Sequence, residues 1–446
     1  MKRLLAAAAF VLTASIPARA ADVKNIDLGK QAQVWFVEDH TVPIVSFNIS
    51  LPAGAAYDPA GKGGLASFAA SMMDEGAGNL DSAAYHRALA AKAILFSARV
   101  ERDYTVISIT AQSADAGEAM RLLQLALTKP RFDNDTLTRV RTEILQSLQQ
   151  EEAQPQRVAA KGFMRAFFNG HTYGHATDGE AASIGAITAA DLKAFARTHW
   201  VKNGLMIAMA GDISQDAATR LLGQTFAPLP ATVPPPPPNV GRLGAPGLHV
   251  QPMAVPQPNA VFGLPGIMRA DPDFITAYVA NYILGGGGFS SRLMTEVREK
   301  RGLTYGINTS IDSFRKASVW VGQVATRADA IGQTLEVVRQ TMRDFAARGP
   351  TQAELDDAKT FLTGSFPLAF DSNAGIATQL GTFQRQGLDV GYVARRNSLI
   401  QAVTLADVRR VSKHLFDPAR LTVMVAGGPA PQAPKPVDKP APKPTP

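Results

Sequence analysis

The chain carries one pattern twice, and this duplication limits its possible folds more than any other feature. Residues 185–212, GAITAADLKAFARTHWVKNGLMIAMAGD, align without gaps with residues 401–428, QAVTLADVRRVSKHLFDPARLTVMVAGG. Upstream, TAQSADA at 110–116 corresponds to VATRADA at 324–330 with nearly the same offset. Two matches in the same order indicate a duplicated α+β domain. Three matched pairs carry turn or cap chemistry: Thr188 with Thr404, Asp191 with Asp407, and Gly211 with Gly427.

Both halves alternate between strand-like and helix-like periodicity. Alternating apolar positions predict half-buried strands, and apolar residues three or four apart predict helices. Hairpins beside long helices favour a mainly antiparallel mixed sheet packed with helices. We therefore expect an α+β fold of two homologous domains. The predicted strands are 42–51, 98–112 with a turn near 102–103, 259–265, 303–312 and 317–325, and the predicted helices are 115–128, 135–153, 157–168, 272–284, 290–301, 328–347 and 352–366.

Proline-rich segments divide the 446 residues. Residues 227–247 include five consecutive prolines at 234–238 and predict a stiff, extended linker. Residues 429–446 alternate Pro, Ala and Lys and predict a disordered tail. The remaining chain divides into an N-terminal domain at 21–226 and a C-terminal domain at 248–428, each of ordinary domain size.

The first twenty residues have the pattern of an export signal. Lys2 and Arg3 precede an apolar run at 4–16, and ARA at 18–20 is an A-x-A cleavage site. An N-terminal membrane anchor is the alternative, but it needs about 20 apolar residues. We predict cleavage after Ala20 and a periplasmic location. No later run has the length and apolarity to span a bilayer, so we expect a soluble mature protein.

Charge and cysteine content exclude several classes of function. Removing Lys2, Arg3 and Arg19 from the 45 basic residues leaves a net charge of +4 against 38 acidic residues. No dense basic block with interleaved aromatics is present, so we expect no nucleic-acid partner. The chain has no cysteine, which excludes disulfides and thiol catalysis.

A run of small residues at 64–73, GLASFAASMM, lies in a longer stretch that resembles a known family. VWFVEDHTVPIVSFNISLPAGAAYDPAGKGGLASFAASMM at 34–73, followed by GHTYGHATDGEAASIGAITAADLKAFARTHW at 170–200, is similar to the pitrilysin/insulinase family of zinc peptidases. The resemblance extends through both halves. In that family the helix after GLA carries the inverted zinc signature H-x-x-E-H, with two histidine ligands and a glutamate base.

At the positions that the resemblance assigns to zinc chemistry, this chain has no ligand. Ser67, Ala70 and Ser71 stand where the signature has His, Glu and His, and the helix at 64–76 is expected to survive as scaffold. A third ligand is expected roughly 75 residues later, where this chain has Ser147. Serine hydroxyls are poor zinc ligands and alanine accepts no proton. We expect no metal and no catalytic residue of its own in this chain.

Other candidate ligands have simpler interpretations. His171 and His175 are four residues apart, but Gly170 and Gly174 break a helix there, and a structural turn is the favoured reading. The other five histidines are scattered singly. Glu151 and Glu152 are interpreted as a solvated helix end.

The second half retains a segment that matches the family's substrate-binding region, LGGGGFSSRLMTEVREKRGLTYGINTSI at 284–311. Its four glycines favour a turn, Ser290 is a candidate cap for the next helix, and Gly302 suits a left-handed helix end. The resemblance implies an Arg and a Tyr seven residues apart, and Arg298 and Tyr305 have this spacing. A guanidinium suits peptide carbonyls, and a phenol suits a developing oxyanion.

The resemblance implies a division of labour, because some bacterial members of the family form heterodimers of a zinc-bearing and a metal-free chain. We predict that this chain is the substrate-binding, non-catalytic subunit of a periplasmic zinc peptidase that degrades peptides, with zinc in a homologous partner. Arg298 and Tyr305 would reach that partner's site. Their local alternative is structural, with Arg298 at a helix end and Tyr305 in a strand.

Three other functions remain open. A structural or peptide-binding protein without peptidase activity would be similar to family members in respiratory complexes. A homodimeric peptide-binding chamber is a second alternative. A self-sufficient peptidase is the third, and it would require zinc bound by this chain.

Overall fold

The computed structural model describes residues 22–29 and 32–428. The predicted export signal and the predicted tail at 429–446 lie outside the described residues. Within the described ranges, no helix combines the length and apolarity needed to cross a bilayer.

The N-terminal half, residues 22–226, is built on a six-stranded sheet in the order β1-β2-β8-β3-β7-β6. All neighbours are antiparallel except β2 and β8. A short β4–β5 hairpin stands apart from this sheet. The strands are β1 (Lys24–Ile26), β2 (Ala32–Glu38), β3 (Ile44–Leu51), β4 (Gly76–Ala77), β5 (Leu80–Asp81), β6 (Leu95–Val100), β7 (Thr105–Gln112) and β8 (Leu205–Gly211). The helices are α1 (Leu65–Ser71), α2 (Ser82–Ala91), α3 (Ala116–Thr128), α4 (Asn134–Glu152), α5 (Pro155–Phe168), α6 (Ala181–Ala186), α7 (Ala189–His199) and α8 (Gln215–Phe226).

The C-terminal half, residues 248–428 with Gly247 beginning its first strand, repeats this plan with five strands in the order β11-β12-β10-β13-β9. Only β13 and β9 are parallel. The strands are β9 (Gly247–Gln251), β10 (Asn259–Pro265), β11 (Ile307–Ser313), β12 (Ser318–Ala325) and β13 (Thr422–Ala426). The helices are α9 (Phe274–Asn281), α10 (Ile331–Arg348), α11 (Gln352–Gly364), α12 (Asn373–Arg385), α13 (Tyr392–Ala402) and α14 (Leu405–Leu415). The predicted α+β class with two homologous, mainly antiparallel sheets is confirmed.

The duplicated residues make the same local structure in both copies. Thr188 begins α7 and Thr404 begins α14, each in a reciprocal capping box with the aspartate three residues later. The strands that follow, β8 and β13, occupy equivalent positions in the two sheets. They end at Gly211 (φ +142°) and Gly427 (φ +109°), backbone conformations that favour glycine.

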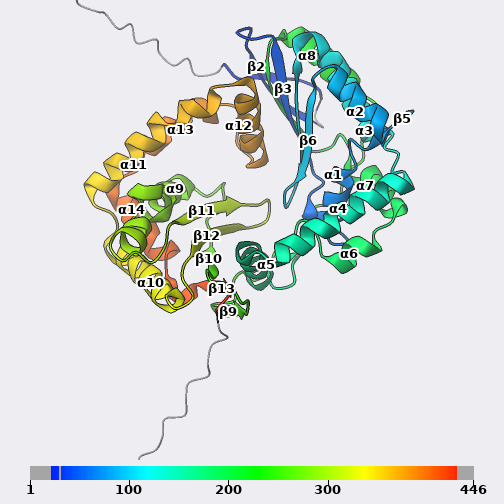
Figure 1. Cartoon of the computed structure of the whole chain (residues 1–446). Helices are drawn as coiled ribbons and strands as arrows, with labels where there is room; N and C mark the ends of the chain where they lie inside the picture. Colours follow the sequence, from blue (N-terminus) through cyan, green and yellow to red (C-terminus); the bar gives the residue numbers. More distant parts are fainter. Residues whose placement is uncertain (1–21, 30–31, 429–446) are drawn as a thin grey trace, which may run out of the picture.

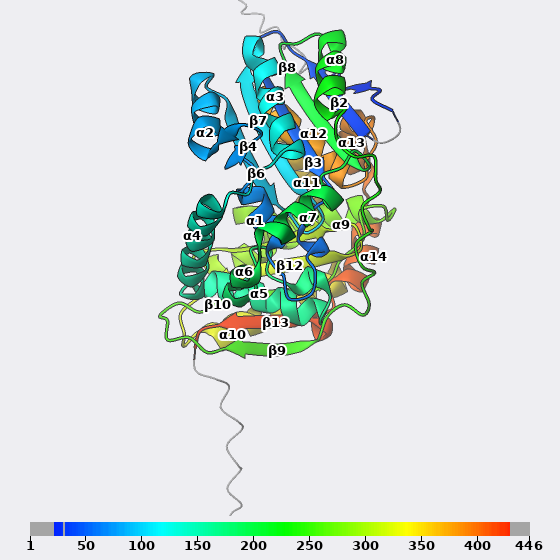
Figure 2. The ribbon, with the colours of Figure 1, turned by 90° about the vertical axis from the view of Figure 1, so that its right-hand side faces the viewer.

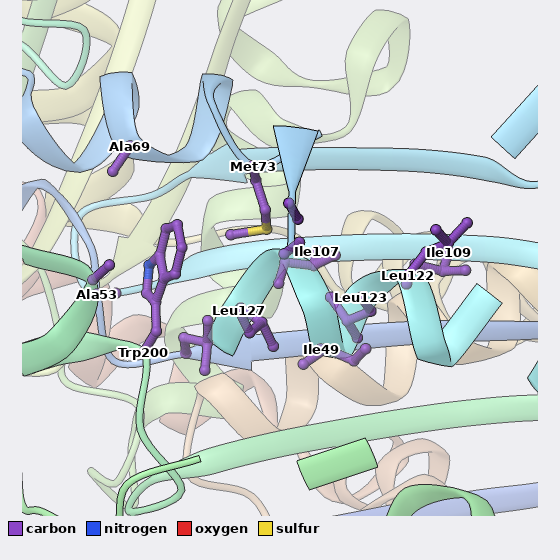
Figure 3. Packing of buried hydrophobic residues seen from close by; sticks show 14 of the residues in the cluster. Ile49, Ala53, Ala69, Met73, Ile107, Ile109, Leu122, Leu123, Leu127 and Trp200 are labelled. Carbon is purple, nitrogen blue, oxygen red and sulfur yellow. The ribbon is translucent and has the colours of Figure 1, made fainter. Parts of the chain in front are cut away.

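One face of each sheet is covered by helices of its own half. In the N-terminal half, α1, α3, α7 and α8 bury a continuous apolar layer on the sheet. Figure 3 shows Leu122, Leu123 and Leu127 of α3 beside Ile49 of β3 and Ile107 of β7. In the C-terminal half, α9, α10, α11 and α14 cover the equivalent face. These two layers form the main cores.

The opposite face of each sheet is covered by a helix from the other half. Helix α12 lies on β3 and β8 of the N-terminal sheet, and α5 lies on β10 and β13 of the C-terminal sheet (Figure 1). Leu380 of α12 packs with Trp35 of β2, and Phe163 of α5 packs with Val261 of β10. The view in Figure 2 shows α5 and β13 on the same side of the molecule. The two halves are therefore interlocked by a reciprocal exchange of helices.

Glycine permits a close approach of helix and sheet both where α12 lies on the N-terminal sheet and where α5 lies on the C-terminal sheet. A Cβ atom at Gly381 in α12 would collide with Asn48 of β3, and one at Gly263 in β10 would lie 2.6 Å from the Phe163 ring of α5. Polar side chains of α12 also bind the sheet. Gln384 donates to the Ile207 carbonyl (3.2 Å), and Arg385 donates to Asn48 Oδ1 (3.0 Å).

The linker at 227–247 lies against the N-terminal half. Residues 230–246 contain no helix or strand. The Pro230 carbonyl accepts a hydrogen bond from the Lys202 N–H (2.9 Å), and the Gly244 N–H donates to the Phe167 carbonyl (2.9 Å). Thr232 accepts from the Asn203 side chain (3.0 Å). These bonds fix both ends of the extended segment.

Several predicted boundaries are wrong. The helix expected at 64–76 ends at Ser71, because Met72 and Met73 turn back into the core. The strand expected at 303–312 begins at Ile307. Thr304 holds a turn before it, accepting from the Gly306 N–H (3.0 Å) and donating to the Ala325 carbonyl (2.7 Å). Glu151, interpreted as solvated, is mostly covered and pairs with Lys161 of α5 at 2.7 Å.

The exchange of helices predicts that damage to α12 destabilises the N-terminal half. Leu380→Ala removes a fully buried side chain from the cluster around Trp35 and should lower the free energy of unfolding by about 2–5 kcal/mol. Leu399→Ala on the exposed side of α13 is the matched control, with an expected change within about 0.5 kcal/mol. Denaturant titration followed by tryptophan fluorescence measures both. Equal effects of the two variants would contradict the interlocked arrangement.

Candidate functional site

Helix α1 carries the positions where the family has its zinc signature. Asp58 holds the start of this helix by accepting from the backbone N–H groups of Gly64 (2.7 Å) and Ala66 (2.8 Å). Burial raises the pKa of Asp58 to about 7, against the lowering effect of these bonds. Gly64 has φ +88°, and a Cβ there would meet the backbone of Gly179 at 2.9 Å. The helix start is fixed by capping and close packing.

The four degenerate positions lie on two neighbouring helices. Ser67, Ala70 and Ser71 are on α1, and Ser147 is on α4, which packs against α1. The Ser67 hydroxyl donates to Asp178 Oδ1 (3.0 Å). Ala70 is buried with 4% exposure, and Ser71 and Ser147 face solvent. The structure thus brings these four positions onto two helices in contact, and their side chains are hydroxyl and methyl groups.

Contacts within the protein hold α1 against α4. The Arg141 guanidinium of α4 lies 5.7 Å from the centre of the Phe68 ring on α1, a cation–π geometry. Arg141 also donates to the Ile187 carbonyl (2.5 Å). Leu65, Phe68 and Ala69 of α1 are buried in the main core. The scaffold of the site therefore persists by packing.

A second cluster has the residue types of a metal site, and the sequence analysis missed it. Asp74, Glu75 and His86 have potential ligand atoms within 4.8 Å of one another. Their sequence spacing gives no helical motif, and the β4–β5 hairpin and α2 bring them together. Glu75 accepts from Ser82 (2.6 Å) and pairs with the Arg139 guanidinium. Burial opposes ionisation, but these two partners hold the pKa of Glu75 below its usual range.

The predicted turn at His171 and His175 is confirmed as a turn. A 3-10 segment spans Thr172–Gly174, and the Tyr173 N–H donates to His171 Nδ1 (3.0 Å). His171 Nε2 lies 3.2 Å from the Pro238 carbonyl of the linker. Both ring nitrogens of His171 are thus engaged within the protein.

The segment around Arg298 and Tyr305 has unusual backbone geometry. Two π-helices, Tyr282–Gly286 and Met294–Glu299, are the only ones in the described ranges. Such helices are rare and often lie at functional sites. The second is followed by a turn that closes at Gly302, whose φ is +59°, the predicted left-handed conformation, and whose N–H donates to the Arg298 carbonyl (2.8 Å). Ser290 does not cap the helix; the Met294 N–H donates to Ser291 Oγ (3.4 Å) instead.

A buried polar network lies under the glycine turn. Asn281 Oδ1 accepts from the Thr309 hydroxyl and from Trp320 Nε1, both at 2.7 Å. A Cβ atom at Gly286 would lie 2.6 Å from Asn281 Nδ2, and one at Gly285 would lie 2.5 Å from Thr309 Oγ1. The glycines thus let the turn lie directly on this network, which fixes it to β11 and β12.

Arg298 is half-buried and Tyr305 is exposed. The Arg298 guanidinium lies 4.6 Å from the centre of the Phe289 ring, and Phe289 is 66% exposed. Tyr305 is 85% exposed at the turn before β11. Among residues 22–29 and 32–428, no carboxylate pairs with Arg298 and no protein group bonds the Tyr305 hydroxyl. Both groups are therefore available to a ligand.

The two-sheet fold, the short helix α1 beside α4 and the glycine-rich segment define a metallopeptidase-like protein. A family model described as Insulinase (Peptidase family M16) matches residues 33–180, and one described as Peptidase M16 inactive domain matches residues 186–362. The chain belongs to peptidase family M16.

Individual relatives agree with this placement. A crystal structure of a peptidase M16 inactive domain from Pseudomonas fluorescens has 30% identity and a TM-score of 0.86, covering 93% of this chain and 99% of that chain. The Non-peptidase homolog YmxG of Helicobacter pylori is 26% identical over 379 residues, which cover 84% of this chain and 87% of the relative. The probable mitochondrial-processing peptidase subunit beta of Schizosaccharomyces pombe is 25% identical, with 85% of each chain covered. The chain is thus similar to proteins named as an inactive domain and as a non-peptidase homologue, and also to a chain named as a peptidase subunit.

The geometry predicts that zinc binding can be restored by supplying ligands. The triple variant Ser67→His, Ser71→His, Ser147→Glu should bind one zinc ion, because the first two positions share a face of α1 and the third lies on the adjacent α4. A version with Ser147→Gln is the matched control and should bind zinc about tenfold or more weakly. Titration calorimetry measures both affinities. Equal affinities would show that α4 does not present residue 147 to the site.

Proposed function

We propose that this chain is the non-catalytic, substrate-binding subunit of a periplasmic zinc peptidase. The export signal predicted at 1–20 supports the location. The zinc would lie in a homologous partner that carries H-x-x-E-H, and this chain would supply Arg298 and Tyr305 to the partner's site. The observation that carries the proposal is that the Arg298 and Tyr305 side chains stay free while all four zinc positions are lost.

The local structure supports a role in binding. An arginine at a helix end commonly pairs with an acidic neighbour, as Arg301 does with Glu296 (2.7 Å) in the same segment. Arg298 instead stacks on Phe289, which orients the guanidinium and leaves its donors unused. A planar fork of donors binds peptide carbonyls or a developing oxyanion. The fission yeast relative is named as one subunit of a peptidase.

The partner is testable directly. Tagged mature chain is purified from periplasm, and proteins present in stoichiometric amount are identified by mass spectrometry. The proposal requires a companion with H-x-x-E-H, and it requires that the pair cleaves an unstructured peptide while neither chain does so alone. A chain that purifies alone, or with membrane-complex subunits only, contradicts the proposal and favours a binding or scaffold role.

The roles of the two side chains predict a loss of catalytic rate. In the reconstituted pair, Arg298→Ala and Tyr305→Phe should each lower kcat/KM by about 10²–10³, the usual cost of one lost oxyanion donor. Arg301→Ala and Tyr282→Phe are matched controls in the same segment and should retain activity. Steady-state peptide hydrolysis measures all four. Full activity of both test variants would remove the proposed roles.

A further inference from the structure

A groove separates helix α5 from the outer strands of the C-terminal sheet. Helix α5 covers β10 and β13 but leaves part of β11 and β12 open. The groove has a volume of about 250 Å³. Ala160, Phe163 and Met164 of α5 form its apolar wall. It is formed by both halves of the chain.

The opposite wall of the groove is polar, because every second residue of β11 is polar and side chains alternate between the two faces of a strand. Asn308, Ser310 and Asp312 alternate along β11, so their side chains lie on one face of the sheet. All three line the groove. In the register with β12 they stand opposite Gln323, Val321 and Val319. This wall therefore carries hydrogen-bonding groups and one carboxylate.

Asp312 has no cationic partner among the described residues. Its one side-chain bond is accepted from the Ser310 hydroxyl at 2.8 Å. Two cations of α5 lie outside this groove and are paired: Lys161 with Glu151 and Arg165 with Glu180. Asp312 is exposed at the rim of the groove, and partial desolvation by the neighbouring groups raises its pKa. A carboxylate in such surroundings gains from a positively charged ligand.

The strand that carries Asp312 is an edge. In the described sheet, β11 has β12 on one side and no strand on the other. An extended peptide can add to such an edge through main-chain hydrogen bonds, and alternate side chains then enter pockets on each face. A residue opposite Asp312 would place its Cβ about 5 Å from that of Asp312. This arrangement suits a lysine or arginine.

We propose that the groove between α5 and β11 binds an extended peptide segment and that Asp312 pairs with a positively charged nitrogen of that segment. The expected position of the peptide along β11 rests on the proposed function, because Tyr305 lies just before this strand. Tyr305 lies in the turn before β11, and within the strand Ile307 and Asp312 are five residues apart, which is about 17 Å of extended chain. The cation would therefore lie about five residues or more from the bond held at Arg298 and Tyr305. The substrate class is an unstructured peptide with a basic group at that distance.

Asp312 has a structural alternative, because a charge on an edge strand also prevents strands of different molecules from pairing. The two roles differ in their dependence on the ligand. A charge that only prevents strand pairing between molecules affects self-association and gives no preference for a positively charged peptide. A binding residue discriminates peptides by charge.

Binding of fluorescent ten-residue peptides to the full mature chain tests the proposal. Three peptides that differ only in charge are compared. The first is N-acetylated and has norleucine at one position, and the second is N-acetylated and has lysine at that position. The third has norleucine there and a free amino terminus. The lysine position is moved stepwise along the peptide. Fluorescence anisotropy should show about five- to tenfold tighter binding for a charged peptide than for the uncharged one, with a preference that falls in high salt. The second and third peptides distinguish a side chain from an amino terminus as the source of the charge.

Asp312→Asn is the informative variant, since it keeps the shape of the side chain and its bond with Ser310. It should bind all three peptides equally. Asp329→Asn, at an exposed site that pairs with Arg327, is the matched control and should keep the preference. A wild-type chain without charge preference, or a preference that survives Asp312→Asn, overturns the proposal. Increased self-association of Asp312→Asn with an unchanged preference assigns the residue to edge protection.

The same experiment separates failure of this inference from failure of the proposed function. Arg298→Ala and Tyr305→Phe should leave the charge preference intact, because their effect is on hydrolysis in the reconstituted pair. If the preference depends on Asp312 but hydrolysis is insensitive to Arg298 and Tyr305, the groove binds peptides and the proposed catalytic support is wrong. If hydrolysis depends on Arg298 and Tyr305 while no charge preference exists, the groove proposal alone is wrong.

Discussion

The exchange of α5 and α12 between the halves is the interaction on which the rest of the structure depends. Each sheet has two apolar faces, and the helices of its own half cover only one. Trp35 and Ala208 on the N-terminal sheet would be exposed without Leu380, as would Val261 on the C-terminal sheet without Phe163. Burial of such side chains contributes about 1.5–3 kcal/mol each. Neither half satisfies its own sheet, so the chain folds as an interlocked pair.

This interlock also builds the groove that is proposed to bind a peptide. Because α5 belongs to the N-terminal half and β11 to the C-terminal half, the groove beside Asp312 exists only where the halves meet. Other polar contacts join the halves nearby. Asp103 accepts from the Tyr173 hydroxyl (2.6 Å) and from the Arg315 N–H (2.8 Å). Burial raises the pKa of Asp103, while these bonds favour its charged form.

The sequence predicted what is encoded locally or by repetition. The duplicated Thr/Asp caps and terminal glycines identified equivalent elements, and Gly302 was placed correctly at a left-handed helix end. Features that depend on distant residues were missed. Glu151 meets Lys161 only because α4 and α5 pack together, and Asp74 meets His86 only through the β4–β5 hairpin.

The position of α12 and the backbone of the segment at 284–311 also depend on distant residues and could not be predicted from the sequence. Nothing in α12 itself says that it covers the opposite half. The first π-helix directly follows Asn281, whose side chain bonds Thr309, a residue far away in the sequence. Ser291, rather than Ser290, became the cap for the same reason, since the glycine turn sets which serine faces the next helix.

The persistence of α1 without metal follows from how it is held. In a metal site, ligand bonds contribute directly to the ordering of the helices that carry them. Here Asp58 caps the first turn, Ser67 bonds Asp178, and Phe68 is held between the core and Arg141. A seven-residue helix is too short to be stable alone. Packing, capping and side-chain bonds within the protein therefore supply the order that this short helix lacks on its own.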